Sequence, residues 1–127
     1  MDVIMSIKPK YADRILNGTK KFEFRRSIPK RIDEIDKVFI YSTFPIQRVI
    51  GHFTVKEVHK MNPLELWLHT WKQAGIEIKD FQTYFKDKEF GYAIEIDEMI
   101  AYEKPLLFKE IDSTGKIPQS FKYIQQG

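Results

Sequence analysis

Residues 17–26 read NGTKKFEFRR, and this stretch decides how the chain is interpreted. It opens with an Asn-Gly turn signal. Two phenylalanines then alternate with charged residues, which predicts a half-buried β-strand over 20–26. On such a strand the phenylalanines face a core, and Glu23 and Arg25 point to the opposite side. The pattern leaves open whether this charged face meets water or lines a site.

The sequence on either side predicts a small α+β domain that spans residues 1–127. Apolar runs and alternation predict strands, and apolar residues three or four positions apart predict helices. The expected strands cover residues 2–7, 37–43, 48–58 and 89–99, the last continuing through 100–108, and the expected helices cover residues 9–17, 62–75 and 79–87. Short strands with a glycine bend and few helices favour a strongly bent sheet or barrel over a doubly wound sheet.

The helix expected over 62–75 carries an apolar stripe. Asn62 is suited to cap it, with Pro at the next position. The stripe consists of Leu64, Trp67, Leu68 and Trp71 at helical spacing. Such a stripe is typical of a helix packed on a core, so we expect both tryptophans to be buried. The alternative is a platform on which nucleic-acid bases stack.

Positive charge is concentrated near the start of the chain. The net charge is only +3, but residues 8–31 hold nine lysines and arginines against two acidic residues. Lys8 and Lys10 stand at the start of the first expected helix, where the helix dipole disfavours cations and a bound anion would offset them. This excess predicts an anionic partner, nucleic acid first. The alternative is a solvated basic surface.

Several classes of protein are not supported by the sequence. It has no glycine-rich phosphate loop and no dinucleotide-binding motif, so we expect no cofactor. His52, His59 and His69 lack the spacing of a zinc helix and there is no cysteine, so we expect no metal. The chain start does not resemble a secretory signal and no apolar run is long enough for a membrane span. These features predict a cytoplasmic protein.

The opening stretch also resembles a known signature. Gly18-Thr-Lys20-Lys-Phe-Glu23-Phe-Arg25 matches the GxKxxExR motif of ASCH domains at all four fixed positions. The surrounding sequence is similar to the family in order and spacing. The similar segments are SIKPKYADRILNG (6–18), VFIYSTFPIQRVIGHFTV (38–55) and FQTYFKDKEFGYAIEI (81–96). The chain is therefore identified as a stand-alone ASCH protein.

This resemblance implies a PUA-like curved β-barrel with a few helices at its openings and a cleft beside the first helix. Lys20, Glu23 and Arg25 would line the cleft, and Gly18 would permit the turn that presents Lys20. A carboxylate there can accept a hydrogen bond from a base amino group, while the cations hold phosphate or carbonyl oxygens. The alternative is a Glu23–Arg25 surface ion pair worth about 0–1 kcal/mol. Together with the basic stretch, the expected ligand-binding residues are Lys8, Gly18, Lys20, Glu23, Arg25 and Arg26.

Three functions remain open on this basis. PUA-like folds are mostly associated with RNA, which favours an RNA- or nucleotide-binding protein. Some small ASCH proteins are amidohydrolases on acylated cytidine and others ribonucleases, which makes Lys20 and Glu23 catalytic candidates. The amidohydrolase branch has Thr where this chain has Glu23. The sequence does not place the later Glu that this branch requires, for which Glu65 and Glu77 are guesses. The third function, a coactivator-like protein-binding module, follows from the family name alone.

Overall fold

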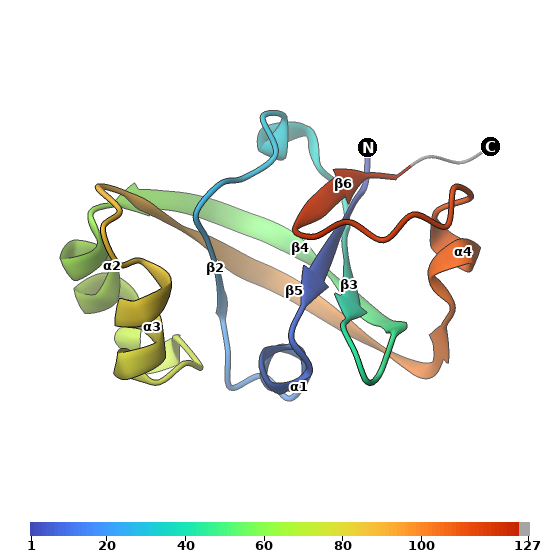
Figure 1. Ribbon diagram of the computed structural model, residues 1–127, viewed down its shortest axis with the longest axis horizontal. Helices are drawn as coiled ribbons and strands as arrows, with labels where there is room; N and C mark the ends of the chain where they lie inside the picture. The colour runs from blue at the N-terminus through green and yellow to red at the C-terminus, as the bar shows by residue number, and fades with distance from the viewer. Residues whose placement is uncertain (125–127) are drawn as a thin grey trace.

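The computed structural model describes residues 1–124 and consists of a curled six-stranded sheet flanked by short helices (Figure 1). The strands are β1 (Val3–Ile7), β2 (Phe22–Arg25), β3 (Val38–Ser42), β4 (Arg48–Met61), β5 (Gly91–Leu106) and β6 (Phe121–Tyr123). They are arranged in the order β2-β5-β4-β3-β1-β6. β1 and β3 are parallel and the other neighbours antiparallel. The expected α+β fold with a strongly curved sheet is confirmed, in the form of a half-barrel.

The helices lie at the ends of the curled sheet. They are α1 (Pro9–Leu16), α2 (Pro63–Thr70), α3 (Ile78–Tyr84) and α4 (Phe108–Ile111), with 3-10 turns η1 (Ile32–Glu34) and η2 (Trp71–Gln73). Figure 1 shows α1 across the opening between β2 and β1, α2 and α3 at one end of the long β4–β5 pair, and α4 at the other. None of the helices in residues 1–124 is long and apolar enough to cross a membrane.

Alternation along the strands divides the apolar residues among three cores. Inside the curl, alternate residues of β1 and β3 pack with α1. The opposite face of β1 and β3 packs under α4. The third core joins Phe22 and Phe24 of β2 to α2 and α3. β3 is buried along its whole length because it has a core on each face, as its unbroken apolar sequence predicted.

The two long strands begin and end within three residues of the expected positions. The continuation expected beyond residue 99 is real, because β5 runs unbroken to Leu106. Register shifts interrupt its pairing with β4, one of them beside Gly51, where the sequence predicted a bulge or bend. β6 was not expected. It has three residues, too few for alternation to be recognised, and it forms by pairing with β1.

The expectation for the apolar stripe of α2 was wrong in three of its four positions. Leu64, Leu68 and Trp71 are exposed, with relative accessibilities of 69%, 64% and 52%. The buried residues of α2 are Leu66 and Thr70, which share the face that meets the third core. Apolar side chains surround most of this helix, so periodicity could not identify the buried side. Of the four residues of the stripe, Trp67 alone is partly buried, with its ring centroid 5.0 Å from that of Phe81.

Candidate functional site

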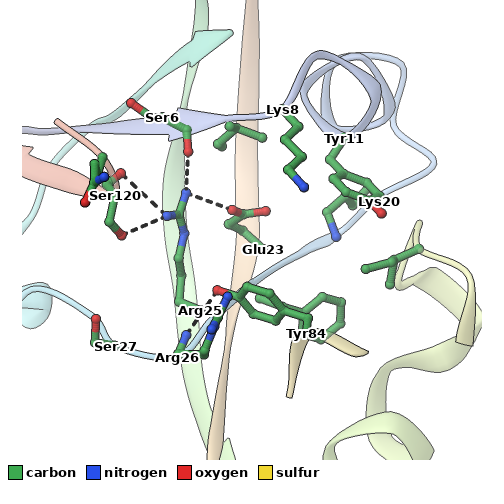
Figure 2. Close-up of a pocket in the computed structure, with 14 residues that line it drawn as sticks. Ser6, Lys8, Tyr11, Lys20, Glu23, Arg25, Arg26, Ser27, Tyr84 and Ser120 are labelled. Carbon is green, nitrogen blue, oxygen red and sulfur yellow. Dashed lines mark hydrogen bonds and ion pairs between the residues drawn. The ribbon is translucent and has the colours of Figure 1, made fainter. Parts of the chain in front are cut away.

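A cleft lies where the two outer strands of the sheet approach each other. β2 and β6 end the strand order and are not paired with one another. Arg25 bridges them instead. Its Nη2 donates to the Ser6 carbonyl of β1 at 3.0 Å, and its Nη1 donates to Ser120 Oγ, just before β6, also at 3.0 Å (Figure 2). The guanidinium therefore closes the curl through side-chain hydrogen bonds.

The cleft beside this bridge has a volume of about 450 Å³. That volume lies within the ~300–1,000 Å³ typical of ligand sites. It is bounded by β1 and the start of α1, by β2, by α3 and by the segment before β6. Its lining residues are Ser6, Ile7, Lys8, Tyr11, Lys20, Glu23, Phe24, Arg25, Arg26, Ser27, Ile76, Tyr84, Gln119 and Ser120. Four of them are cations and one is acidic, so the cleft favours an anionic ligand.

The Glu23–Arg25 pair is buried, which excludes the surface ion pair considered above. Arg25 Nη2 lies 3.0 Å from Glu23 Oε2, and each side chain is only 8% exposed. In the part of the chain that the structure describes, the Arg25 Nε–H is buried without an acceptor. Because its other nitrogens contact Glu23, Ser6 and Ser120, Arg25 holds the Glu23 carboxylate in place at the cleft wall.

Lys20 is the most deeply buried cation of the cleft. It is 2% exposed, its Nζ donates to the Ala74 carbonyl at 2.9 Å, and the same atom lies 4.6 Å from the centroid of the Phe24 ring. Gly75 makes this packing feasible, because a Cβ there would lie 2.4 Å from Lys20 Cβ. Burial lowers the pKa of Lys20 to about 8, opposed by the nearby Glu23 charge. A fraction of Lys20 is therefore neutral near pH 8 and can accept a proton.

Two tyrosines supply aromatic walls. Tyr84 of α3 accepts a hydrogen bond from the Arg26 backbone N–H at 3.2 Å, and the Arg26 guanidinium lies 4.3 Å from its ring centroid. Tyr11 of α1 lies 5.5 Å from Lys20 Nζ, measured to its ring centroid. Figure 2 shows Lys8 and Lys20 extending toward the side of the cleft where Glu23 lies. Aromatic rings and cations are thus both present in the wall of the cleft.

The structure brings together five of the six expected ligand-binding residues. Lys8, Lys20, Glu23, Arg25 and Arg26 all line the cleft. Gly18 does not. Its φ of +84° forms the turn that leads to Lys20, so its contribution is to the backbone conformation.

The two acidic candidates of the amidohydrolase hypothesis lie elsewhere. Glu77 pairs with Arg14 at 3.0 Å outside the cleft, and the hydrogen bond from that arginine lowers the pKa of Glu77 to about 2. Glu65 lies in the first turn of α2, where its backbone N–H donates to the capping Asn62. Neither residue is among those that line the cleft.

Sequence reasoning missed several residues of the site. Tyr11 and Tyr84 stand among apolar residues at helical spacing in the sequence, and such spacing does not separate a core from a cleft wall. Ser6 and Ser120 enter through β1 and the segment before β6. They are 114 residues apart. No local pattern marks them, since the pairing of β1 with β6 alone brings them together.

Comparisons with known proteins agree with this fold. The ASCH domain model matches residues 5–105. The crystal structure of ASCH from Zymomonas mobilis superposes with a TM-score of 0.87 at 25% identity, covering 98% of this chain and 88% of that one. An ASCH domain-containing ribonuclease of Zymomonas mobilis is 25% identical over 127 residues, which is 98% of this chain and 85% of that protein. The large ribosomal subunit protein uL22 of Ureaplasma parvum is 26% identical over 124 residues, 97% of this chain but 39% of that longer protein.

Proposed function

We propose that this chain, which belongs to the ASCH domain family, binds single-stranded RNA or a nucleotide in the cleft between α1 and β2. The observation that carries the proposal is the combination of exposed cations with aromatic walls. Lys8 and Arg26 are exposed at the cleft, and Tyr11 and Tyr84 are half-buried beside them. Cations that follow a phosphate backbone and rings on which bases stack are the usual elements of single-strand binding.

Within this proposal the buried and exposed charges have different tasks. Lys8 and Arg26 contact phosphate oxygens, because they are accessible and not engaged in an ion pair among the described residues. Glu23, held by Arg25, accepts a hydrogen bond from the amino group of a base. Lys20 contacts a phosphate or carbonyl oxygen at the bottom of the cleft. A cytoplasmic location, expected from the cysteine-free sequence, is part of the same proposal.

The experiment is a titration of short fluorescently labelled single-stranded RNAs, followed by anisotropy at several salt concentrations. We expect the logarithm of the affinity to fall linearly with the logarithm of salt concentration. Arg26→Gln and Lys8→Gln should each reduce that slope by about 1 and weaken all RNA sequences about equally. Lys104→Gln makes the same charge change at an exposed position outside the cleft and serves as the control.

Two results would contradict the proposal. One is the absence of RNA and nucleotide binding even at low salt. The other is equal binding by the wild-type protein and the Arg26→Gln and Lys8→Gln variants, because the cations that define the cleft would then be irrelevant.

RNA cleavage is the second candidate function, and the burial of Lys20 favours it. A neutral Lys20 can accept the proton of a ribose 2′-hydroxyl. The 2′-oxygen then bonds to the adjacent phosphorus, the bond from phosphorus to the 5′-oxygen breaks, and the leaving oxygen takes a proton from solvent. The similarity to an ASCH domain-containing ribonuclease agrees with this chemistry.

The cleavage hypothesis has its own test. A labelled RNA is incubated with the protein. The control is a DNA strand of the matching sequence, which lacks every 2′-hydroxyl. Cleavage of the first alone, with a rate that rises with pH through about 8 and is lost in Lys20→Met, supports it. Equal cleavage of both strands, or full activity in Lys20→Met, would show that Lys20 is not the base.

A further inference from the structure

A second cluster of polar side chains lies on the β4–β5 pair, outside the cleft. Glu57 and His59 of β4 and Glu95 of β5 place one ligand atom each within 4.8 Å of the others. His59 Nε2 is 2.8 Å from Glu95 Oε1 and 3.9 Å from Glu57 Oε2. A single imidazole nitrogen thus faces two carboxylates.

The two carboxylates are in an unfavourable position without a cation between them. Glu57 and Glu95 are register partners on neighbouring antiparallel strands. Like charges directly opposite one another destabilise a sheet. Lys56 offers partial compensation through an Nζ–Glu95 Oε2 distance of 3.7 Å, but its side chain is 63% exposed. An exposed pair of this kind contributes little, so the arrangement still favours a more strongly bound cation.

His59 and His69 add nitrogen ligands to this pair of carboxylates. The His59 side chain is 11% exposed, and its ring packs against Phe22, with 6.1 Å between the ring centroids. The His69 ring, from α2, has its centroid 4.7 Å from that of His59. His69 is exposed and lies outside the group of three, so a rotation of its side chain is required to direct a ring nitrogen at the carboxylates. Three ligand atoms from β4 and β5 therefore lie together, and a second imidazole, from α2, packs beside them.

We propose that this cluster binds a divalent transition metal ion, zinc first, through His59, His69, Glu57 and Glu95. Two nitrogens and two oxygens suit the four-coordinate geometry that zinc prefers. Imidazole ligands disfavour magnesium and calcium, which take oxygen ligands. The ion offsets the opposed carboxylates and ties α2 to β4 and β5. Spacing along the chain predicted no metal, because the ligands are distributed over three elements.

The test is calorimetric titration of untagged protein with zinc chloride, with magnesium chloride as the comparison. We expect one zinc ion per chain, no magnesium binding, and an increase in melting temperature with zinc. His59→Gln, His69→Gln and Glu95→Gln should each weaken zinc binding at least tenfold. His52→Gln is the matched control, because His52 contacts Tyr102 and lies outside the cluster.

The variants also separate the site from adventitious binding. Zinc affinity that is equal in wild type, His59→Gln and Glu95→Gln would overturn the proposal, as would a loss of the same size in His52→Gln. Unchanged affinity in His69→Gln alone would overturn the link to α2. If His59→Gln does not fold, the zinc affinities of Glu57→Gln and His69→Gln are compared with that of the wild type. Unchanged affinity in both would then overturn the proposal. Cobalt(II) absorption provides a second readout, since a four-coordinate site gives an intense visible band that these variants should lose.

Discussion

β2 and α2 invert the usual distribution of polar and apolar side chains. On β2 the charged residues Glu23 and Arg25 are buried, and on α2 the apolar residues Leu64 and Leu68 are exposed. The difference lies in what each element has as a neighbour. β2 has a core on one face and the cleft wall on the other, whereas α2 packs one narrow face at the end of the sheet. Burial in this molecule therefore follows position in the fold more closely than residue type.

Removal of the cation from β2 should have the largest effect on stability of the changes that test this comparison. Arg25→Met leaves the buried Glu23 carboxylate without its partner and removes the bonds to Ser6 and Ser120. We expect the free energy of unfolding in urea to fall by about 3–5 kcal/mol. Adding Glu23→Gln to Arg25→Met should restore part of the loss. A change below about 1 kcal/mol would mean that the pair behaves as an exposed one.

Truncation of the buried side chain of α2 should cost almost as much. Leu66 is fully buried in the third core, so Leu66→Ala creates a cavity there. We expect the free energy of unfolding to fall by about 2–5 kcal/mol. Urea unfolding followed by tryptophan fluorescence measures it. A loss under about 1 kcal/mol would contradict the assignment of Leu66 to the packed face.

Lys20 should give the protein a pH-dependent stability of a definite sign. Its pKa is about 8 in the folded chain, below the ordinary value of 10.5. Between these two values the unfolded chain binds a proton that the folded chain has released, so stability rises with pH across this window. The full rise is about 3 kcal/mol. Urea unfolding of wild type and Lys20→Met from pH 7 upward isolates this contribution, and parallel curves would contradict it.

The smallest effect is expected on the exposed side of α2. Leu68→Gln changes a side chain that is 64% exposed, two residues from Leu66 on the same helix. We expect the free energy of unfolding to change by no more than about 0.5 kcal/mol. The difference between Leu68→Gln and Leu66→Ala is the sharpest form of the comparison. A large loss of stability in Leu68→Gln would show that the Leu68 side of α2 belongs to the packed core.

Local patterns in the sequence were sufficient for most of the sheet and for several of the residues that line the cleft. The alternation of β2 correctly separated Phe22 and Phe24 from Glu23 and Arg25, because a strand with different surroundings on its two faces has a period of two. Three residues of the signature, Lys20, Glu23 and Arg25, then prove to line the cleft. Both inferences rest on residues close together in the chain.

What the sequence could not predict depends on contacts between distant residues. The exposure of Trp71 follows from how α2 and η2 pack against the sheet, and helical periodicity does not contain that information. Ser120 joins the site only through the pairing of β6 with β1. The proximity of His59 to His69 likewise requires α2 to fold back over β4. Each of these features is a property of the assembled sheet.

The width of the cleft depends on the Arg25 bridge. Backbone ladders fix the spacing between paired strands at about 4.8 Å, whereas in residues 1–124 the Arg25 side chain spans the gap from β2 to β1 and to the segment before β6. The width of the cleft therefore depends on the length and the hydrogen bonds of the side chain at position 25. A change at this single position could widen or narrow the entrance without altering any strand pairing. Ligand size could thus be tuned independently of the architecture that supports the cleft.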